Sequence, residues 1–161
     1  MLIGLLSDTH DRLPAMIAAV NLLRQRGAEF FIHCGDVGSE QILDQLAGLP
    51  AAFVFGNNDW DLRSLERYAQ SIGVQCLLHF GDLELGGKRI AVVHGDDAKL
   101  LARILTDQEH DYLLKGHSHQ REDRRVGRTR IINPGALHRA LQKSVALLNT
   151  ETDELTFMPV Q

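Results

Sequence analysis

The sequence has little cysteine, no long apolar run and no excess of basic charge. Only Cys34 and Cys76 are present, without CxxC spacing, so no disulfide framework is expected and a reducing compartment is consistent. No stretch approaches the roughly 18 apolar residues that a bilayer span needs. The first residues also lack the basic region and the length of a signal peptide. These absences predict a cytoplasmic protein.

The balance of charge and hydrophobicity narrows the class further. With 17 Lys and Arg against 21 Asp and Glu, the net charge is −4, which argues against a general nucleic-acid-coating protein. The 161 residues are 44% hydrophobic and 24% charged, enough for a sizeable core, so wholesale disorder is excluded. Because we find no linker, low-complexity segment or repeat of fixed period, we expect one domain over residues 1–161.

Short apolar runs alternate with helix-like segments in the first part of the chain. Runs at residues 2–7, 30–34 and 51–55 predict strands, and the spacing at 13–26, 39–47 and 61–72 predicts helices. Such alternation indicates βαβ units and a largely parallel sheet. The second half is β-rich, with a helix expected at 98–106 and strands at 75–79, 82–85, 89–94, 111–115, 121–126, 129–132, 144–149 and 155–160.

Five polar clusters follow the predicted strands. They are Asp8-Thr9-His10, Gly35-Asp36, Gly56-Asn57-Asn58-Asp59, His94-Gly95-Asp96 and Gly116-His117-Ser118-His119. One such motif means little, since roughly 0.6 Asp-x-His pairs are expected by chance in this composition. All five together offer carboxylates, imidazoles and an amide at strand ends, where the loops of an α/β sheet meet. The set therefore predicts a metal site.

In this order the motifs resemble the calcineurin-like metallophosphoesterases, and within them the small prokaryotic phosphodiesterase branch of YfcE-like proteins. The family order D-x-H, G-D, G-N-x-D/E, H-G and G-H-x-H is matched from Asp8 to His119. The likeness continues through Ile132-Asn133-Pro134-Gly135, so it spans almost the whole chain. It implies an α/β fold, a four-layer α/β/β/α sandwich of two mixed sheets.

The resemblance also implies a ligand set for two divalent metal ions. Asp8, His10 and His119 would hold one ion; Asn57, His94 and His117 would hold the other; and Asp36 would bridge both. Imidazoles favour manganese, iron, cobalt, nickel or zinc over magnesium or calcium, and the ligand types do not choose among these five. Manganese is the expected ion, with nickel, cobalt, iron and zinc compatible. In the implied mechanism a metal-bridging hydroxide, held through Asp36, Asn57 and His94, attacks phosphorus in line.

One position departs from the family pattern. Many members have histidine after the motif asparagine, where it can protonate the leaving oxygen, but here Asn58 follows Asn57. An amide is not a general acid. We therefore expect modest catalysis that favours aryl or nucleotide diesters, unless His33, His138 or a metal-bound water donates the proton. Asp59 is expected to orient a histidine ligand, with helix capping as the alternative.

Other polar residues have structural interpretations. We expect His33 and Cys34 in the core, His79 and His110 structural or solvated, Asp96 and Asp97 at a helix cap, and Ser118 as a turn residue. Asp11 and Arg12 could face the substrate phosphate or form a solvated loop pair, and His138 and Arg139 could reach the rim of the site. The run of Arg121, Arg124, Arg125, Arg128 and Arg130 predicts a solvated hairpin, with an anion-recruiting patch for a nucleotide or RNA end as the alternative.

The favoured function is hydrolysis of a small-molecule or nucleotide phosphodiester. A rival is a noncatalytic binding protein on the same fold, like the phosphoesterase-like subunit of the retromer coat. Leu62, Leu65 and Tyr68 could then form a partner surface, although burial against the sheet is the simpler interpretation. A phosphomonoesterase ranks lowest, because the short chain leaves little room for a docking subdomain. Nothing in the sequence specifies an oligomeric state.

Overall fold

A six-stranded sheet is built around the first strand of the chain. The computed structural model describes residues 1–161. On one side of β1 (Leu2–Leu6) the strands β2 (Phe30–His33), β3 (Ala51–Phe53) and β4 (Gln75–Cys76) run parallel to it. On its other side β10 (Ser144–Asn149) pairs antiparallel with β1 and with β11 (Glu154–Pro159). This sheet is therefore mixed.

A second mixed sheet of five strands packs against the first. Its order is β5 (Phe80–Leu85), β6 (Lys88–Val93), β7 (Tyr112–Leu114), β9 (Thr129–Pro134) and β8 (Arg121–Val126). The pairs β6–β7 and β7–β9 are parallel, whereas the hairpins β5–β6 and β8–β9 are antiparallel.

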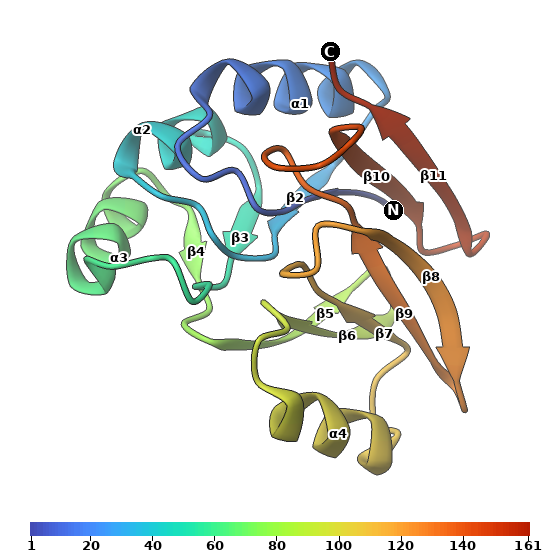
Figure 1. Ribbon diagram of the computed structural model, residues 1–161. Helices are drawn as coiled ribbons and strands as arrows, with labels where there is room; N and C mark the ends of the chain where they lie inside the picture. Colours follow the sequence, from blue (N-terminus) through green and yellow to red (C-terminus); the bar gives the residue numbers. More distant parts are fainter.

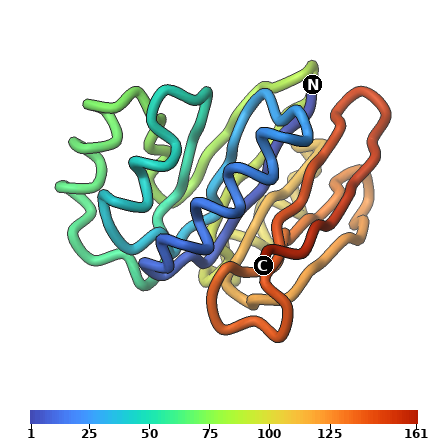
Figure 2. The backbone as a smooth tube through the Cα atoms, turned by 90° about the horizontal axis from the view of Figure 1, so that it is seen from above, coloured from blue at the N-terminus to red at the C-terminus, as the bar shows by residue number.

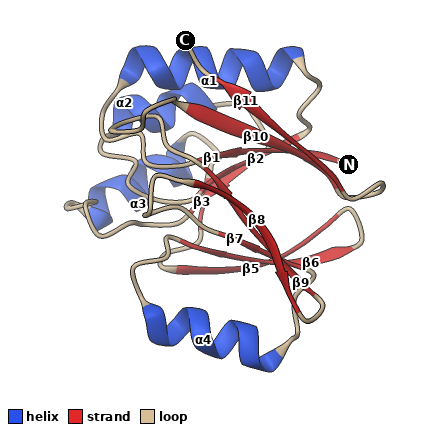
Figure 3. Cartoon of the chain, turned by 45° about the vertical axis from the view of Figure 1, so that its right-hand side comes forward, coloured by secondary structure: helices blue, strands red, loops and turns tan.

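Helices cover the outer face of each sheet. On the first sheet lie α1 (Leu13–Gln25), α2 (Glu40–Leu43) with the 3-10 turn η1 (Asp44–Leu46), and α3 (Leu62–Ser71). On the second lies α4 (Ala98–Asp107), so the order of layers is α/β/β/α (Figures 1 and 3). Seen from above, α1 crosses the first sheet with β10 and β11 beside it (Figure 2). The predicted four-layer sandwich is confirmed.

Strand alternation divides the apolar side chains between two main cores. In β1, Ile3 and Leu5 point into the core between the sheets, whereas Leu6 packs toward the helices. Gly4 faces α1, where an added Cβ would lie 3.0 Å from Leu23. Leu65 is buried in the helix-side core with Leu62 and Tyr68 packed against it, so burial, and not a partner surface, accounts for these three residues.

Two predicted elements differ from the structure. The strand expected at 75–79 ends at Cys76, because Leu78 has a φ of 59°, which is incompatible with a strand. The helix expected at 39–47 is one α turn followed by η1, and the Ala47 N–H donates to the Asp44 carbonyl in the tighter 3-10 pattern. No helix in the structure is long and apolar enough to cross a membrane.

Candidate metal centre

The five polar loops meet at the carboxyl-terminal edge of the strands. Backbone hydrogen bonds join them, from the Asp8 N–H to the Gly35 carbonyl (3.0 Å) and from the Gly116 N–H to the His94 carbonyl (2.8 Å). The second of these bonds joins the loops after β6 and β7, and the first joins the loops after β1 and β2. The convergence that the strand-end positions predicted is therefore present.

Two carboxylates and three imidazoles form a group in this loop cluster, in which Asp8, Asp36 and His94 are buried and His10 and His119 half-buried. His10 Nε2 and His94 Nε2 each lie 3.3 Å from Asp36 Oδ2, and His119 Nε2 lies 3.2 Å from Asp8 Oδ1. The buried atoms Asp8 Oδ1, His10 Nε2 and His94 Nε2 have no hydrogen-bond partner. Buried polar atoms are almost always paired, so orphaned acceptors aimed at one another indicate a missing cation. Imidazole and carboxylate donors fit a divalent transition metal.

The other polar atoms of these side chains are held by the protein. The Nδ1–H of His94 donates to the Cys34 carbonyl (2.8 Å), which leaves the Nε2 lone pair facing the group. Similarly, His119 Nδ1 lies 3.5 Å from the Arg139 carbonyl, so that Nε2 faces the group. Asp8 Oδ2 accepts from the Ser7 hydroxyl (2.6 Å) and from the His117 N–H (3.1 Å). In Asp8, His94 and His119 one polar atom is thereby fixed, and the other is free for a ligand.

Asp36 lies between His10 and His94 and is bound by Asn58, whereas Asp8 is shared by both possible metal-holding triads, Asp8 with His10 and His119 and Asp8 with Asp36 and His94. The Asn58 N–H donates to Asp36 Oδ1 (2.8 Å), and its Nδ2–H donates to Oδ2 (3.0 Å). Burial alone would raise the pKa of Asp36, but the neighbouring His94 and the hydrogen bonds from Asn58 outweigh it and hold that pKa well below its usual range. Burial likewise opposes a charged His94, yet without a cation in the group the nearby Asp36 raises the pKa of His94 to about 9, and a bound metal ion would take the place of that proton. Asp36 is therefore held as an anion.

The remaining two predicted ligands lie at the edge of the group. The structure gathers Asp8, His10, Asp36, His94 and His119, while Asn57 and His117 are exposed. The His117 ring is centred 5.1 Å from the His94 ring, and the Asn57 side chain makes no hydrogen bond. The role of both residues as ligands stays a prediction.

The Asp59 carboxylate binds backbone N–H groups and does not contact a histidine, contrary to the expectation from sequence. Its carboxylate accepts from the N–H groups of Asp36 (3.1 Å), Gly38 (2.9 Å) and Gly56 (2.8 Å). The cap of α3 is Asp61, which accepts from the Ser64 N–H, so the capping alternative is also wrong for Asp59. Burial raises the pKa of Asp59 despite these bonds. Asp59 thus ties the loop after β2 to the loop after β3.

Backbone strain is concentrated at this site. Residues in the left-handed region include Asp8 (φ 54°), His10 (46°), Asp36 (55°), His117 (69°) and His119 (58°), five of the seven predicted ligands. Non-glycine residues persist in this region only where the surroundings over-determine them, and such residues cluster at functional sites. Gly56 is needed for close approach, since an added Cβ would lie 2.1 Å from Asp36 Oδ1.

The segment at 132–135 supports the histidine loop. Asn133 Nδ2 donates to the Gly116 carbonyl (2.8 Å) and to Ser118 Oγ (3.0 Å). Ser118 also accepts from the Gln120 N–H and is exposed, as expected for a turn residue. These bonds fix the conformation of the loop that carries His117 and His119.

Several structural interpretations are borne out. His33 Nε2 lies 2.7 Å from the Thr9 hydroxyl, and both His33 and Cys34 are fully buried. His110 is buried against Asp82, with Nε2 3.2 Å from Oδ1, while His79 is exposed. Asp97 caps α4 by accepting from Lys99 and Leu100.

Burial of His33 gives stability a defined pH dependence. Burial lowers the pKa of His33 from 6.5 to about 3. As pH falls, His33 takes up a proton in the unfolded chain before it does so in the folded protein. The contribution of neutral His33 to the free energy of unfolding is therefore complete above pH 6.5 and is lost between pH 6.5 and about 3, by about 1.4 kcal/mol per pH unit. The free energy of unfolding of wild type and of His33→Gln is measured by urea denaturation at several pH values in this window. It should change less steeply with pH in the variant. Equal slopes would contradict the assignment.

The arginine run forms a hairpin whose charges are locally paired. Ion pairs join Arg124 to Glu122, Arg125 and Arg130 to Asp153, Arg128 to Asp111, and Arg130 to Asp123. Arg121 donates to Gln142 and lies over the Phe157 ring. This pairing favours the solvated hairpin over an anion-recruiting patch.

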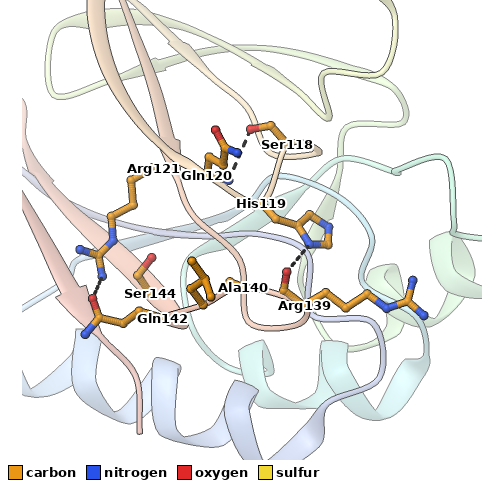
Figure 4. A pocket seen from close by; sticks show the side chains of 9 residues that line it. Ser118, His119, Gln120, Arg121, Arg139, Ala140, Gln142 and Ser144 are labelled. Atoms are coloured by element: carbon orange, nitrogen blue, oxygen red, sulfur yellow. Dashed lines mark hydrogen bonds between the residues drawn. The ribbon is translucent and has the colours of Figure 1, made fainter.

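Two larger cavities flank this group, beside a small one of about 130 Å³ at His94. One of about 360 Å³ is lined by His10, Asp11, Asp36, Gly38, Asn58, Trp60, His138 and Arg139. Another of about 430 Å³ is lined by Ser118, His119, Gln120, Arg121, Arg139, Ala140, Leu141, Gln142 and Ser144 (Figure 4). The larger one contains a single side chain of the group. The cavity of about 360 Å³ reaches His10 and Asp36, so it is the candidate substrate pocket.

The candidate pocket has two rim features that bear on the sequence interpretation. Arg12 Nε donates to His138 Nδ1 (3.2 Å), and the His138 ring is centred 5.3 Å from the His10 ring, so both residues do reach the site. Sequence reasoning missed Trp60, which is 83% exposed at the cavity. Its only sequence signal is that the single tryptophan directly follows the Gly56-Asn57-Asn58-Asp59 motif.

Comparisons with known proteins agree with this geometry. The model of the calcineurin-like phosphoesterase superfamily domain matches residues 1–153. A phosphodiesterase of Methanocaldococcus jannaschii is 29% identical over 159 residues, covering 96% of each chain. The solved structure of an archaeal phosphodiesterase superposes with a TM-score of 0.93 at 26% identity, covering 99% of this chain and 100% of that one.

Vps29 has the same fold. The structure of Vps29 from Entamoeba histolytica, solved with Zn²⁺, superposes with a TM-score of 0.70 at 21% identity over 99% of this chain and 91% of that one. At this identity the likeness concerns the fold alone.

Proposed function

Because the chain belongs to the calcineurin-like phosphoesterase superfamily and is a phosphoesterase, we propose that it hydrolyses phosphate diesters with divalent metal ions bound at the Asp36 group. The observation that carries this proposal is the set of orphaned buried acceptors, Asp8 Oδ1, His10 Nε2 and His94 Nε2, around a carboxylate held as an anion. A substrate pocket of about 360 Å³ opens beside them.

Two ions would divide the predicted ligands between them. Asp8, His10 and His119 would hold one; Asn57, His94 and His117 would hold the other; and Asp36 would contact both, with manganese the expected metal. When bound, such ions supply an activated water at neutral pH and positive charge toward the phosphoryl oxygens. Three of these side chains, His94, Asp8 and His119, are oriented beforehand by the bonds to Cys34, Ser7 and Arg139.

The chain offers no efficient acid for the leaving group. Asn58 donates its amide to Asp36 and has no transferable proton. His33 is fully buried beneath Thr9. Partial burial and the neighbouring Arg12 lower the pKa of His138, which keeps it neutral at pH 7, able to orient an oxygen but a poor proton source. Substrates whose leaving group departs without protonation, such as aryl or nucleotide diesters, are therefore favoured.

Introducing a histidine at position 58 tests this assignment of the missing acid. In Asn58→His, an imidazole replaces the amide beside Asp36, and we expect a gain of about 10- to 100-fold for alkyl diesters relative to aryl diesters. The measurement is the ratio of kcat/KM for the two ester classes at several pH values. An unchanged ratio in a variant that still binds metal would count against the assignment.

The proposed activity is tested by hydrolysis of model esters. Metal-stripped protein, resupplied with Mn²⁺, Ni²⁺, Co²⁺ or Zn²⁺, is expected to hydrolyse bis(p-nitrophenyl) phosphate faster than p-nitrophenyl phosphate. Faster turnover of the monoester would favour a phosphomonoesterase. Metal binding without turnover of either ester would favour the binding-protein alternative.

A further inference from the structure

We propose that the cavity beside His10 and Asp36 binds an aromatic ring of the diester substrate, stacked on Trp60, with Arg139 holding the phosphate charge. The substrate class would then be a nucleotide-containing or aryl phosphodiester. This inference rests on the proposed function and specifies what that site accepts. It comes from the cavity lining, the exposure of Trp60 and the unpaired state of Arg139.

Trp60 is exposed at the cavity, so its ring contributes little buried apolar surface to the fold. It is 83% exposed, although the adjacent Asp59 is only 7% exposed and Leu65 on α3 is 3% exposed. The indole makes no hydrogen bond and no aromatic contact within the protein, so its faces are available. A flat ring bound against it would bury apolar surface on both partners and add a stacking interaction.

The rest of the cavity is polar, which indicates the chemical character of its occupant. Trp60 is the one large apolar side chain in a lining that also contains His10, Asp36, Asn58 and Arg139. The volume of about 360 Å³ lies at the lower end of the range for small-molecule sites. An occupant that uses both parts has one flat aromatic group and one compact polar group next to the metal ligands. A nucleotide or aryl phosphate has this form.

Arg139 supplies a cation that no protein group neutralises. Its guanidinium makes no hydrogen bond or ion pair, whereas four of the five arginines in the run 121–130 pair with acids. Its carbonyl lies 3.5 Å from His119 Nδ1, which places the residue next to the metal ligands. Figure 4 shows the side chain extending away from Arg121 and Gln142. A guanidinium at this rim suits a phosphate oxygen.

Because Trp60 is the only tryptophan, its fluorescence reports on this cavity alone. The full chain, with Zn²⁺ present, is titrated with AMP and, separately, with ribose phosphate, and is excited outside the absorption of adenine. We expect saturable quenching by AMP and none by ribose phosphate over the same concentrations. Arg139→Gln should require a higher AMP concentration. Absence of quenching by AMP, or equal quenching by both compounds, would overturn the inference.

Kinetics with matched substrates separate stacking from a general loss of activity. The stacked ring is taken to belong to the ester group that stays on the phosphate. The p-nitrophenyl ester of thymidine monophosphate and methyl p-nitrophenyl phosphate share a leaving group, but only the first carries an aromatic ring, its base, on the retained group. In Trp60→Ala the KM for the thymidine ester should rise about 5- to 150-fold, with kcat and the constants for the methyl ester nearly unchanged. Trp60→Phe should keep most of the preference. Equal effects on both substrates would contradict stacking on the base.

A matched control removes an exposed aromatic elsewhere. Phe80 is 37% exposed and lines a separate cavity with Asp82 and Arg89, so Phe80→Ala should leave the substrate preference unchanged. A third substrate with p-nitrophenyl groups alone distinguishes an aryl site from a base site, because only an aryl site would make its KM depend on Trp60. If diesters are hydrolysed but Trp60→Ala and AMP have no effect, only this inference fails. If no diester is hydrolysed with any metal, the proposed function fails, while the AMP titration still decides the stacking.

Discussion

Replacing Asp36 with alanine should lower kcat/KM for a diester by at least about 10³-fold, because the charge between the two proposed metal sites is lost. Asp36 Oδ2 lies 3.3 Å from both His10 Nε2 and His94 Nε2, whereas Asp8 Oδ1 is 4.0 Å from each of them. The Asn58 donors that lose their partner lie at the partly exposed edge, where water can replace it, so the fold should persist. Steady-state kinetics with saturating metal measure the effect.

The matched control is an acid in a neighbouring loop. Asp96 follows His94-Gly95 but is exposed and outside the Asp36 group, so Asp96→Ala should stay within about twofold of wild type. Far-ultraviolet circular dichroism of both variants checks that each is folded. Activity of Asp36→Ala within about tenfold of wild type would show that this carboxylate does not carry the chemistry.

Asn in place of Asp59 should affect both stability and activity. The Asp59 carboxylate accepts from three backbone N–H groups, and an amide would direct its own N–H at one of them. The orphaned buried donor should cost about 2–3 kcal/mol, which lowers Tm by about 4–12 °C at this chain length. Because the bonds fix the loops that carry Asp36 and Asn57, kcat/KM should also fall about 10- to 100-fold.

The change from aspartate to asparagine at residue 61, two residues after Asp59, provides the control. Asp61 caps α3 at the exposed surface, and asparagine caps helices about as well as aspartate, so Asp61→Asn should change Tm by less than about 2 °C. Thermal denaturation followed by circular dichroism compares the two variants. If Asp59→Asn were as stable and as active as Asp61→Asn, the proposed tie between the loops would be wrong.

Most of the architecture could be predicted from local sequence patterns. Alternation of apolar runs with helical spacing placed β1 to α3 within a few residues, since each element buries one side in a continuous core. The strand-end motifs placed Asp8, Asp36 and His94 at one edge, because parallel strands end on the same side of a sheet. The division of ligands between two metal ions came from the family resemblance and not from periodicity.

Contacts between distant segments were not predictable from the sequence. Asp59 binds the backbone of Asp36 and Gly38, more than twenty residues away, and a backbone partner leaves no signature in side-chain types. The hydrogen bonds of Asn58 to Asp36 depend on how the loop after β3 approaches the loop after β2. Exposure of Trp60 was hidden for a related reason, since a tryptophan next to a helix start is ordinarily expected in the core.

The number of metal ions bound per chain tests the central claim most directly. Metal-stripped protein is dialysed against Mn²⁺ or Zn²⁺, freed of loosely bound ions, and its metal content is divided by its protein concentration. We predict two ions per chain, held by the Asp36 group with Asn57 and His117 completing the second site. One ion per chain, or none, would contradict a two-metal phosphodiesterase.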